Sequence, residues 1–270
     1  MIIDFHTHIF PEKIALKTIQ HLEGLTDGKA STDGTIEGLL KQMEKANADI
    51  SICLPVLTKP TQFDSVLRFA IEVNERFKNE KGRKLISFAG IHPLCEDIEG
   101  KMKQVKESGI KGVKIHPDYQ ETPIDHEGYI RILKSAKEND LIVVTHSGID
   151  DGYKDKSLNC PPDLVKKVIN QVKHKKFVLG HYGAHAQWEE VLEKLCGEDV
   201  YFDTAFTLHE IDEELFKKIL FKHGEDKVVF ATDCPWRDMA EDVKTLSSYD
   251  LSKDTLDKIF YKNALKLLGL

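Results

Sequence analysis

The chain has 270 residues, of which 41% are hydrophobic and 31% are charged, and its formal net charge is −7. This length allows one barrel-sized domain or two smaller ones, and the composition is that of an ordinary globular protein. The acidic balance excludes the broad basic surface that general nucleic-acid binding requires, so we expect no nucleic-acid partner.

No apolar run approaches the roughly 18–20 residues that cross a bilayer, so we expect no membrane partner. The opening residues Met1–Asp4 show neither the basic segment nor the long apolar region of a signal peptide. The five cysteines are scattered and form no CxxC pair, which is typical of reduced thiols. We therefore expect a cytoplasmic protein.

Eight short β-branched or aliphatic runs recur along the chain, and several are almost continuously apolar. Such runs are typical of a parallel sheet whose strands are covered by helices. The predicted strands are Ile2–Asp4, Ile50–Leu54, Leu85–Ile91, Gly112–Ile115, Leu141–Thr145, Phe177–Gly180, Val200–Asp203 and Val228–Thr232.

Between these runs, apolar residues recur at helical spacing and charged residues occupy the remaining face, which predicts amphipathic helices. The clearest stripes start at Ile36, Val66, Ile98, Leu164, Trp188 and Leu215. Eight strands alternating with helices in about 250 residues predict an α/β fold of the (β/α)8 TIM-barrel type. No glycine-rich phosphate loop follows any strand, and no linker is visible, so we expect one domain over residues 1–270.

Two connections are longer than a minimal turn. One follows the first predicted strand and covers residues 10–34, and the other follows the fifth and covers residues 149–162. In a barrel the loops that follow the strands lie on the catalytic face, so both are candidate substrate walls.

Polar side chains cluster at the carboxyl ends of the predicted strands, which meet at one rim of a barrel. His6 and His8 are two apart, so an extended chain would point both to one side, either toward a metal or into a hydrogen-bonded core. Later strand ends carry Lys114, His116, His146, His181 and Asp233. Asp203, at the seventh strand end, either orients ligands or substrate or caps the helix that follows.

Three imidazoles and one carboxylate suit a borderline divalent metal such as Zn²⁺, with one coordination position open for water or substrate. We assign the ligands to His6, His8, His146 and Asp233. His181 is then a general acid–base or an alternative ligand. For His116 the alternatives are substrate binding and a structural hydrogen bond.

The motifs DFHTH, THSG, GHYG and TDCPW, together with the tail at residues 263–270, resemble the amidohydrolase superfamily. More narrowly they resemble the amidohydrolase-2 branch that includes aminocarboxymuconate-semialdehyde decarboxylase. This resemblance implies a barrel with one metal, usually zinc, at His6, His8, His146 and Asp233, assistance from His181 in decarboxylase members, and a homodimer. In binuclear members a carbamylated lysine bridges two metals, so Lys114 could hold a second metal or instead pair with a substrate carboxylate or an internal acid such as Asp4. We expect one metal.

These observations predict a metal-dependent hydrolase of a small, carboxylated amide, ester or lactone, acting through a metal-activated water, with His181 and Asp233 as the catalytic residues. The alternative is a non-oxidative decarboxylase of an unsaturated or aromatic acid that uses the same site. A phosphoesterase or nuclease is less favoured, because related barrel nucleases place a glutamate where this chain has Lys114. A non-catalytic metal-binding protein is the remaining alternative.

Overall fold

The structure is a computed structural model that describes residues 1–25, 28–153 and 158–270. Strands and helices alternate along the chain, and every strand pairing is parallel. The strands are β1 (Ile3–Thr7), β2 (Ile50–Cys53), β3 (Lys84–Ser87), β4 (Ala89–Gly90), β5 (Gly112–Ile115), β6 (Ile142–Thr145), β7 (Phe177–Leu179), β8 (Tyr201–Asp203) and β9 (Val228–Val229). All eight predicted strands are confirmed.

The strands form a closed barrel. The ladders β1-β2-β3 and β4-β5-β6-β7-β8-β9 are separated only at Phe88, so β3 and β4 occupy one strand position, as the single predicted run implied. At the other side β9 meets β1, where the Phe5 amide donates to the Phe230 carbonyl at 2.9 Å and the Asp233 amide donates to the His6 carbonyl at 2.9 Å. Eight strand positions therefore close into an α/β barrel of the (β/α)8 type.

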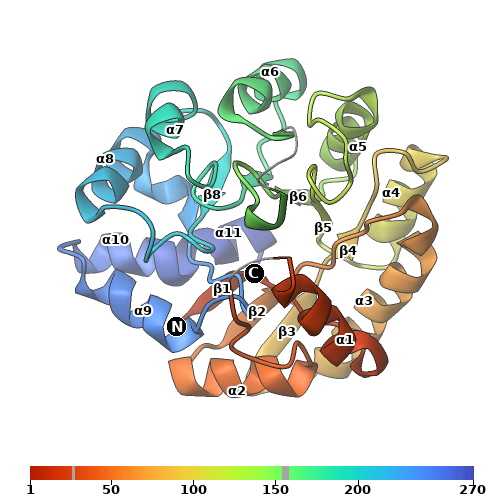
Figure 1. Ribbon diagram of the computed structural model, residues 1–270, viewed down its shortest axis with the longest axis horizontal. Coiled ribbons are helices and arrows are strands. Elements are labelled where there is room, and N and C mark those ends of the chain that lie inside the picture. Colours follow the sequence, from red (N-terminus) through yellow and green to blue (C-terminus); the bar gives the residue numbers. More distant parts are fainter. Residues whose placement is uncertain (26–27, 154–157) are drawn as a thin grey trace.

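Helices surround the strands (Figure 1). They are α1 (Glu12–Glu23), α2 (Ile36–Ala46), α3 (Phe63–Phe77), α4 (Ile98–Glu107), α5 (Glu127–Glu138), α6 (Pro162–Val172), α7 (Trp188–Lys194), α8 (Glu213–His223), α9 (Met239–Ser248), α10 (Lys253–Asp257) and α11 (Asn263–Leu268), with a π-helical turn at Lys258–Lys262. Among the described residues, none of these helices is long and apolar enough to cross a membrane.

Helix α2 illustrates how local sequence sets these elements. The Thr35 hydroxyl accepts from the Gly38 amide at 3.0 Å and so caps the first turn. Leu39 and Met43, four residues apart, are buried against the barrel. Asn47 then ends the helix in a left-handed conformation with φ of 54°.

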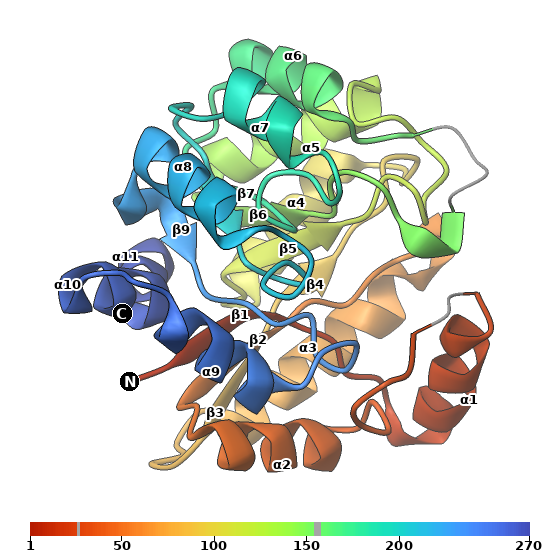
Figure 2. The ribbon, with the colours of Figure 1, turned by 60° about the vertical axis from the view of Figure 1, so that its left-hand side comes forward.

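Helix α1 departs from the prediction, which left residues 10–34 as a loop. It buries only Ala15 and Ile19, while Ile14 and Leu16 are exposed. This apolar stripe is too narrow to stand out as a helical pattern in the sequence. Figure 2 shows α1 apart from the other helices, on the same side of the barrel as the turn at Asp151–Tyr153. Both long connections therefore border the same end of the barrel, and residues 26–27 and 154–157 within them lie outside the described residues.

Apolar side chains pack on both sides of the strands. One cluster fills the barrel and includes Ile3, Phe5, Ile52, Val144 and Val229. A second lies between strands and helices and includes Val113, Ile115, Val143, Met102 and Leu133. The interior cluster leaves the carboxyl ends of the strands to polar residues.

Candidate metal centre

A bulge in β1 turns His6 and His8 into the barrel. Ile3 pairs with Ile50 and Thr7 pairs with Cys53, so β1 takes one residue more than β2 over the same span. Ile3 lies in the interior cluster, whereas Cys53 packs outside the barrel against α2. The extra residue therefore reverses the faces, so that Thr7 points outward with Cys53 and both histidines point inward.

Simple alternation places the other strand-end groups on the interior. In β6, Ile142 and Val144 belong to the interior cluster, and His146 continues this series two residues later. Val229 and Ala231 lead in the same way to Asp233. The inward face of the barrel therefore ends in a ring of polar side chains.

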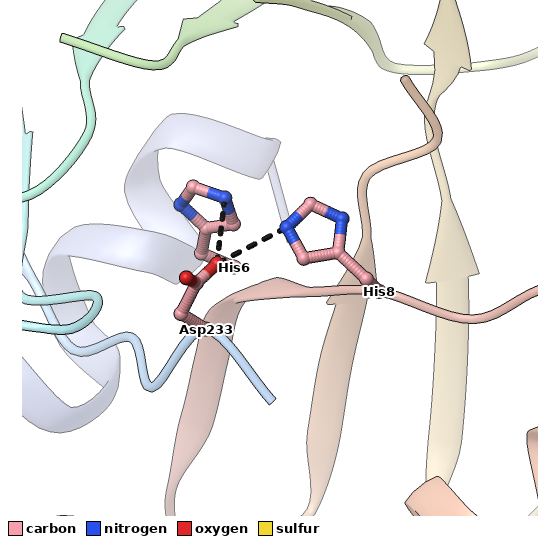
Figure 3. A group of neighbouring side chains, drawn as sticks. All are labelled: His6, His8 and Asp233. Carbon is pink, nitrogen blue, oxygen red and sulfur yellow. Dashed lines mark hydrogen bonds and ion pairs between the residues drawn. The ribbon is translucent and has the colours of Figure 1, made fainter. Parts of the chain in front are cut away.

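His6, His8 and Asp233 converge on one point (Figure 3). The Nε2 atoms of His6 and His8 lie 3.3 and 3.1 Å from Asp233 Oδ1. Ligand atoms about 2.0–2.2 Å from a zinc-like metal lie roughly this far from one another. Asp233 also holds a φ of 71°, which is uncommon for a non-glycine residue and recurs at functional sites. The three donors fit one divalent metal.

The outward nitrogens of these two histidines are occupied. His6 Nδ1 lies 2.9 Å from Asp203 Oδ2, and His8 Nδ1 donates to the Leu54 carbonyl at 2.8 Å. A carbonyl can only accept, so His8 carries its proton on Nδ1 and turns the lone pair of Nε2 toward Asp233. Support of this kind orients metal-bound histidines in general. Of the two roles predicted for Asp203, the contact fits the orientation of a ligand, whereas Asp212 caps the following helix α8.

Lys114 lies beside His6. Its neighbours in β5, Val113 and Ile115, pack outward, so the Lys114 side chain points into the barrel, where Nζ is 2.9 Å from His6 Nε2. The side chain is fully buried, and burial lowers the pKa of Lys114 to about 8. This amine therefore releases its proton more readily than an exposed lysine.

His146 pairs with His181 and is not part of the group formed by His6, His8 and Asp233. His146 Nδ1 lies 2.9 Å from His181 Nε2, and His181 Nδ1 donates to the Ala205 carbonyl at 3.0 Å. Burial lowers the pKa of His181 to about 3, so this ring is neutral at neutral pH. The rings of His6 and His181 are 5.4 Å apart, which places the His146–His181 pair next to the first group.

A second group of donor atoms comprises His116, His146 and Asp150. His116 Nε2 and His146 Nε2 lie 3.6 and 4.0 Å from Asp150 Oδ2, and the two rings stack at 4.3 Å. Asp118 Oδ2 approaches His146 Nε2 to 3.7 Å from another direction. Neither aspartate was predicted as a site residue, although Asp118 follows the strand-end His116 by two residues and Asp150 follows the strand-end His146 by four.

The carboxylates of Asp233, Asp118 and Asp150 differ in the direction of their pKa shifts. Burial alone would raise the pKa of Asp233, but His6 and His8 lower it well below the ordinary range. Burial raises the pKa of Asp118, and it raises the pKa of Asp150 to about 7. Asp233 is therefore an ionised carboxylate at neutral pH, whereas the pKa of Asp150 lies close to neutrality.

The family model described as Amidohydrolase matches residues 3–270. No curated protein matches the chain in sequence. An uncharacterised TIM-barrel protein from Bordetella bronchiseptica superposes with a TM-score of 0.76 and 14% identity, covering 99% of this chain and 98% of the other.

Two decarboxylase structures share the fold. Dihydroxybenzoic acid decarboxylase from Polaromonas, with bound manganese and 2-nitroresorcinol, gives a TM-score of 0.71 and 14% identity, covering 100% of this chain and 97% of the other. 5-Carboxyvanillate decarboxylase from Novosphingobium aromaticivorans, complexed with manganese and 4-hydroxy-3-methoxy-5-nitrobenzoic acid, gives 0.71 and 16%, covering 100% and 96%. At these identities the likeness is one of fold.

Proposed function

The chain belongs to the amidohydrolase family, and from this premise we propose that it is a metal-dependent decarboxylase of a small aromatic or unsaturated acid. The observation that carries the proposal is the convergence of His6, His8 and Asp233 on one point at the catalytic end of the barrel. The decarboxylases that share the fold hold manganese and nitro-substituted phenols. We therefore place decarboxylation ahead of the hydrolysis that the sequence first suggested.

In the proposed centre His6, His8 and Asp233 would hold the metal, and His146, whose Nδ1 faces His181 Nε2 in this structure, would be the remaining ligand. When bound, a divalent metal would polarise the oxygen atoms of the substrate and fix their position. The donor set predicts zinc, whereas the two decarboxylases that share the fold contain manganese. We further propose that residues 1–270 form one domain around this centre.

Decarboxylation breaks the bond between the carboxyl carbon and its neighbouring carbon. The electron pair stays on that neighbour, which takes up a proton as CO2 leaves. His181 suits the proton transfer because its Nδ1–H is held by the Ala205 carbonyl, which leaves Nε2 to accept and return a proton. Asp233 stays ionised as a ligand because the neighbouring histidines lower its pKa.

Hydrolysis of an amide, ester or lactone is the second candidate. The positions of Asp118 and Asp150 favour hydrolysis. These carboxylates lie next to His146 and would repel an anionic substrate when both are ionised. A neutral substrate would avoid this repulsion. The same metal ligands would serve either reaction.

The two reactions are separated by products. Purified protein loaded with Mn²⁺ or Zn²⁺ is incubated with hydroxylated benzoic acids and unsaturated acids while released CO2 is measured, and with ester, amide and lactone substrates while acid release is measured. We expect metal-dependent CO2 release. Turnover restricted to the second panel would replace decarboxylation by hydrolysis.

A further inference from the structure

The outward nitrogens of His6, His8, His146 and His181 are not equally supported by hydrogen bonds. His6 faces Asp203, and His8 and His181 donate to backbone carbonyls. The fourth, His146 Nε2, is buried and has no hydrogen-bond partner among the described residues. Among the described residues, the carboxylate oxygen nearest to it is Asp118 Oδ2 at 3.7 Å, and this oxygen is also buried without a hydrogen bond.

The position of the proton on His146 explains why its Nε2 and Asp118 Oδ2 form no hydrogen bond. His181 Nδ1 donates to a carbonyl, so His181 Nε2 carries a lone pair and can only accept. His146 Nδ1 must then be the donor in the 2.9 Å contact with His181 Nε2. This leaves a lone pair on His146 Nε2 facing the Asp118 carboxylate. Two acceptors that face each other in a buried position are unfavourable, and a proton on His146 Nε2 makes the pair complementary.

We propose that Asp118 is the carboxylate partner that positions His146 as a metal ligand. This inference rests on the proposed metal-dependent function. With His146 as a ligand through Nδ1, the Nδ1 proton would pass to solvent and Nε2 would take one up, and this N–H would donate to Asp118 Oδ2, which now lies 3.7 Å away. The ring changes tautomer without a change in its charge. Asp118 thereby supplies the support that Asp203 gives to His6.

Asp118 is favoured over Asp150 because Asp150 has a partner of its own. The Tyr119 amide donates to His116 Nδ1 at 3.3 Å, so His116 carries its proton on Nε2, which faces Asp150 Oδ2 at 3.6 Å. Asp150 therefore already faces an N–H group of His116, whereas Asp118 Oδ2 has no hydrogen bond in the described structure.

Hydrogen bonds from Asn159 fix the orientation of the Asp118 carboxylate. Asp118 Oδ1 accepts from both the backbone amide and the side-chain amide of Asn159, each at 3.2 Å. In Asp118→Asn the two Asn159 donors keep the amide oxygen at the Oδ1 position. The new NH2 group then points at His146 Nε2, where it can donate to a lone pair but opposes an N–H.

The test compares Asp118→Asn with Asp150→Asn as a matched control, using Mn²⁺ alone as the titrant in calorimetry. Asp118→Asn is expected to weaken Mn²⁺ affinity by about 10–100-fold, the usual effect of removing such a partner. Its metal-free melting temperature is expected not to fall, because the metal-free tautomer gains a donor. Asp150→Asn is expected to change the affinity by less than about threefold, well below that range.

Nitrogen NMR of the Zn²⁺-loaded wild type gives an independent readout, with His146 expected to be protonated on Nε2 and unprotonated on Nδ1. Equal losses of affinity in both variants, no loss in Asp118→Asn, or a protein that binds no divalent metal would each overturn the inference. A wild type that shows the expected affinities and tautomer but releases no CO2 would instead refute the proposed reaction and leave the role of Asp118 intact.

Discussion

Asp203 and His6 form a buried carboxylate–imidazole pair in which Asp203 Oδ2 lies 2.9 Å from His6 Nδ1. The other carboxylate oxygen, Oδ1, accepts from the amides of His181 and Ala205 at 3.0 and 3.1 Å. Backbone amides thus fix Oδ1 of Asp203, and Oδ2 faces the His6 ring. His6 Nε2 on the far side of that ring faces Asp233.

Asp203→Asn should therefore weaken metal binding by about 10–100-fold. The two backbone amides keep the amide oxygen at Oδ1, so the new NH2 group donates to His6 Nδ1 and shifts the His6 proton to Nε2, where the metal would bind. Mn²⁺ calorimetry measures the loss. Asp212→Asn is the control, since Asp212 only caps α8 and its replacement should leave the affinity unchanged. An unchanged affinity in Asp203→Asn would contradict the orienting role.

Asp233→Asn should lower kcat/KM for the substrate by at least about 100-fold, because the centre loses its only carboxylate ligand among the three converging donors. Metal content per chain, measured on the same sample by atomic absorption, should fall with it. Asp226→Asn is the matched control, because Asp226 is an exposed acid that pairs with Lys258 at 3.1 Å. Full turnover in Asp233→Asn would remove this centre from catalysis.

Lys114 should be unmodified, and the loaded protein should hold one metal per chain. Carbamylation needs the neutral amine, and at pH 7 most of this amine is protonated because its pKa, although lowered, is about 8. At pH 9 the neutral form predominates, which makes that pH the stricter check. Intact mass and metal content measured at pH 7 and pH 9 check this expectation. An added CO2 on Lys114 together with two metals per chain would establish the binuclear alternative.

Lys114→Met should retain the metal, because the replacement leaves His6, His8 and Asp233 in place and removes the cation that competes for His6 Nε2. Below about pH 8 the metal-free variant should also be more stable than the wild type, since an apolar side chain replaces a buried charge. Calorimetry and urea unfolding measure the two effects. Loss of the metal in this variant would show that Lys114 takes part in binding.

Stability should fall in acid because of two histidines outside the centre. Burial lowers the pKa of both His174 and His223 to about 4, and each ring nitrogen Nε2 bonds a backbone carbonyl. The unfolded chain binds these protons near pH 6.5 and the folded chain only near pH 4, so the free energy of unfolding decreases as pH falls between those values, by on the order of 3 kcal/mol for each histidine.

Urea unfolding of chelator-treated protein at a series of pH values tests this expectation, and proton NMR follows the two rings directly. Either histidine titrating in the folded protein near pH 6.5 would contradict it.

The sequence predicts the fold well because each of the eight apolar runs forms a strand in the structure. It also predicts that His6, His8 and Asp233 meet, because strand ends of a parallel barrel share one rim. The bulge in β1 is what no periodicity predicts: it arises from pairing with β2, and it decides the face on which His6 and His8 lie. A regular strand would have placed them opposite Ile3 and Phe5, outside the barrel.

The supporting carboxylates were harder to predict. Asp203 sits at a strand end and could be named as a candidate orienting residue, whereas Asp118 and Asp150 lie in loops whose course depends on tertiary contacts. The isolated bridge between Gly148 and His185 shows this dependence, because Gly148 has a φ of 90° and any added Cβ would lie 2.1 Å from the His185 amide nitrogen. This close approach fixes the loop that carries Asp150.

The central claim is that His6, His8 and Asp233 hold a metal that supports decarboxylation. The most direct measurement is CO2 release from a panel of hydroxylated aromatic acids, by wild type loaded with metal, by the same protein after chelation, and by Asp233→Asn. We predict that the wild type releases one CO2 for each decarboxylated product molecule, and that this release stops on chelation and returns when metal is restored. In Asp233→Asn the release should be at least about 100-fold slower. CO2 release that is equal in all three samples, or absent from every acid while an ester or lactone is hydrolysed, would contradict the account.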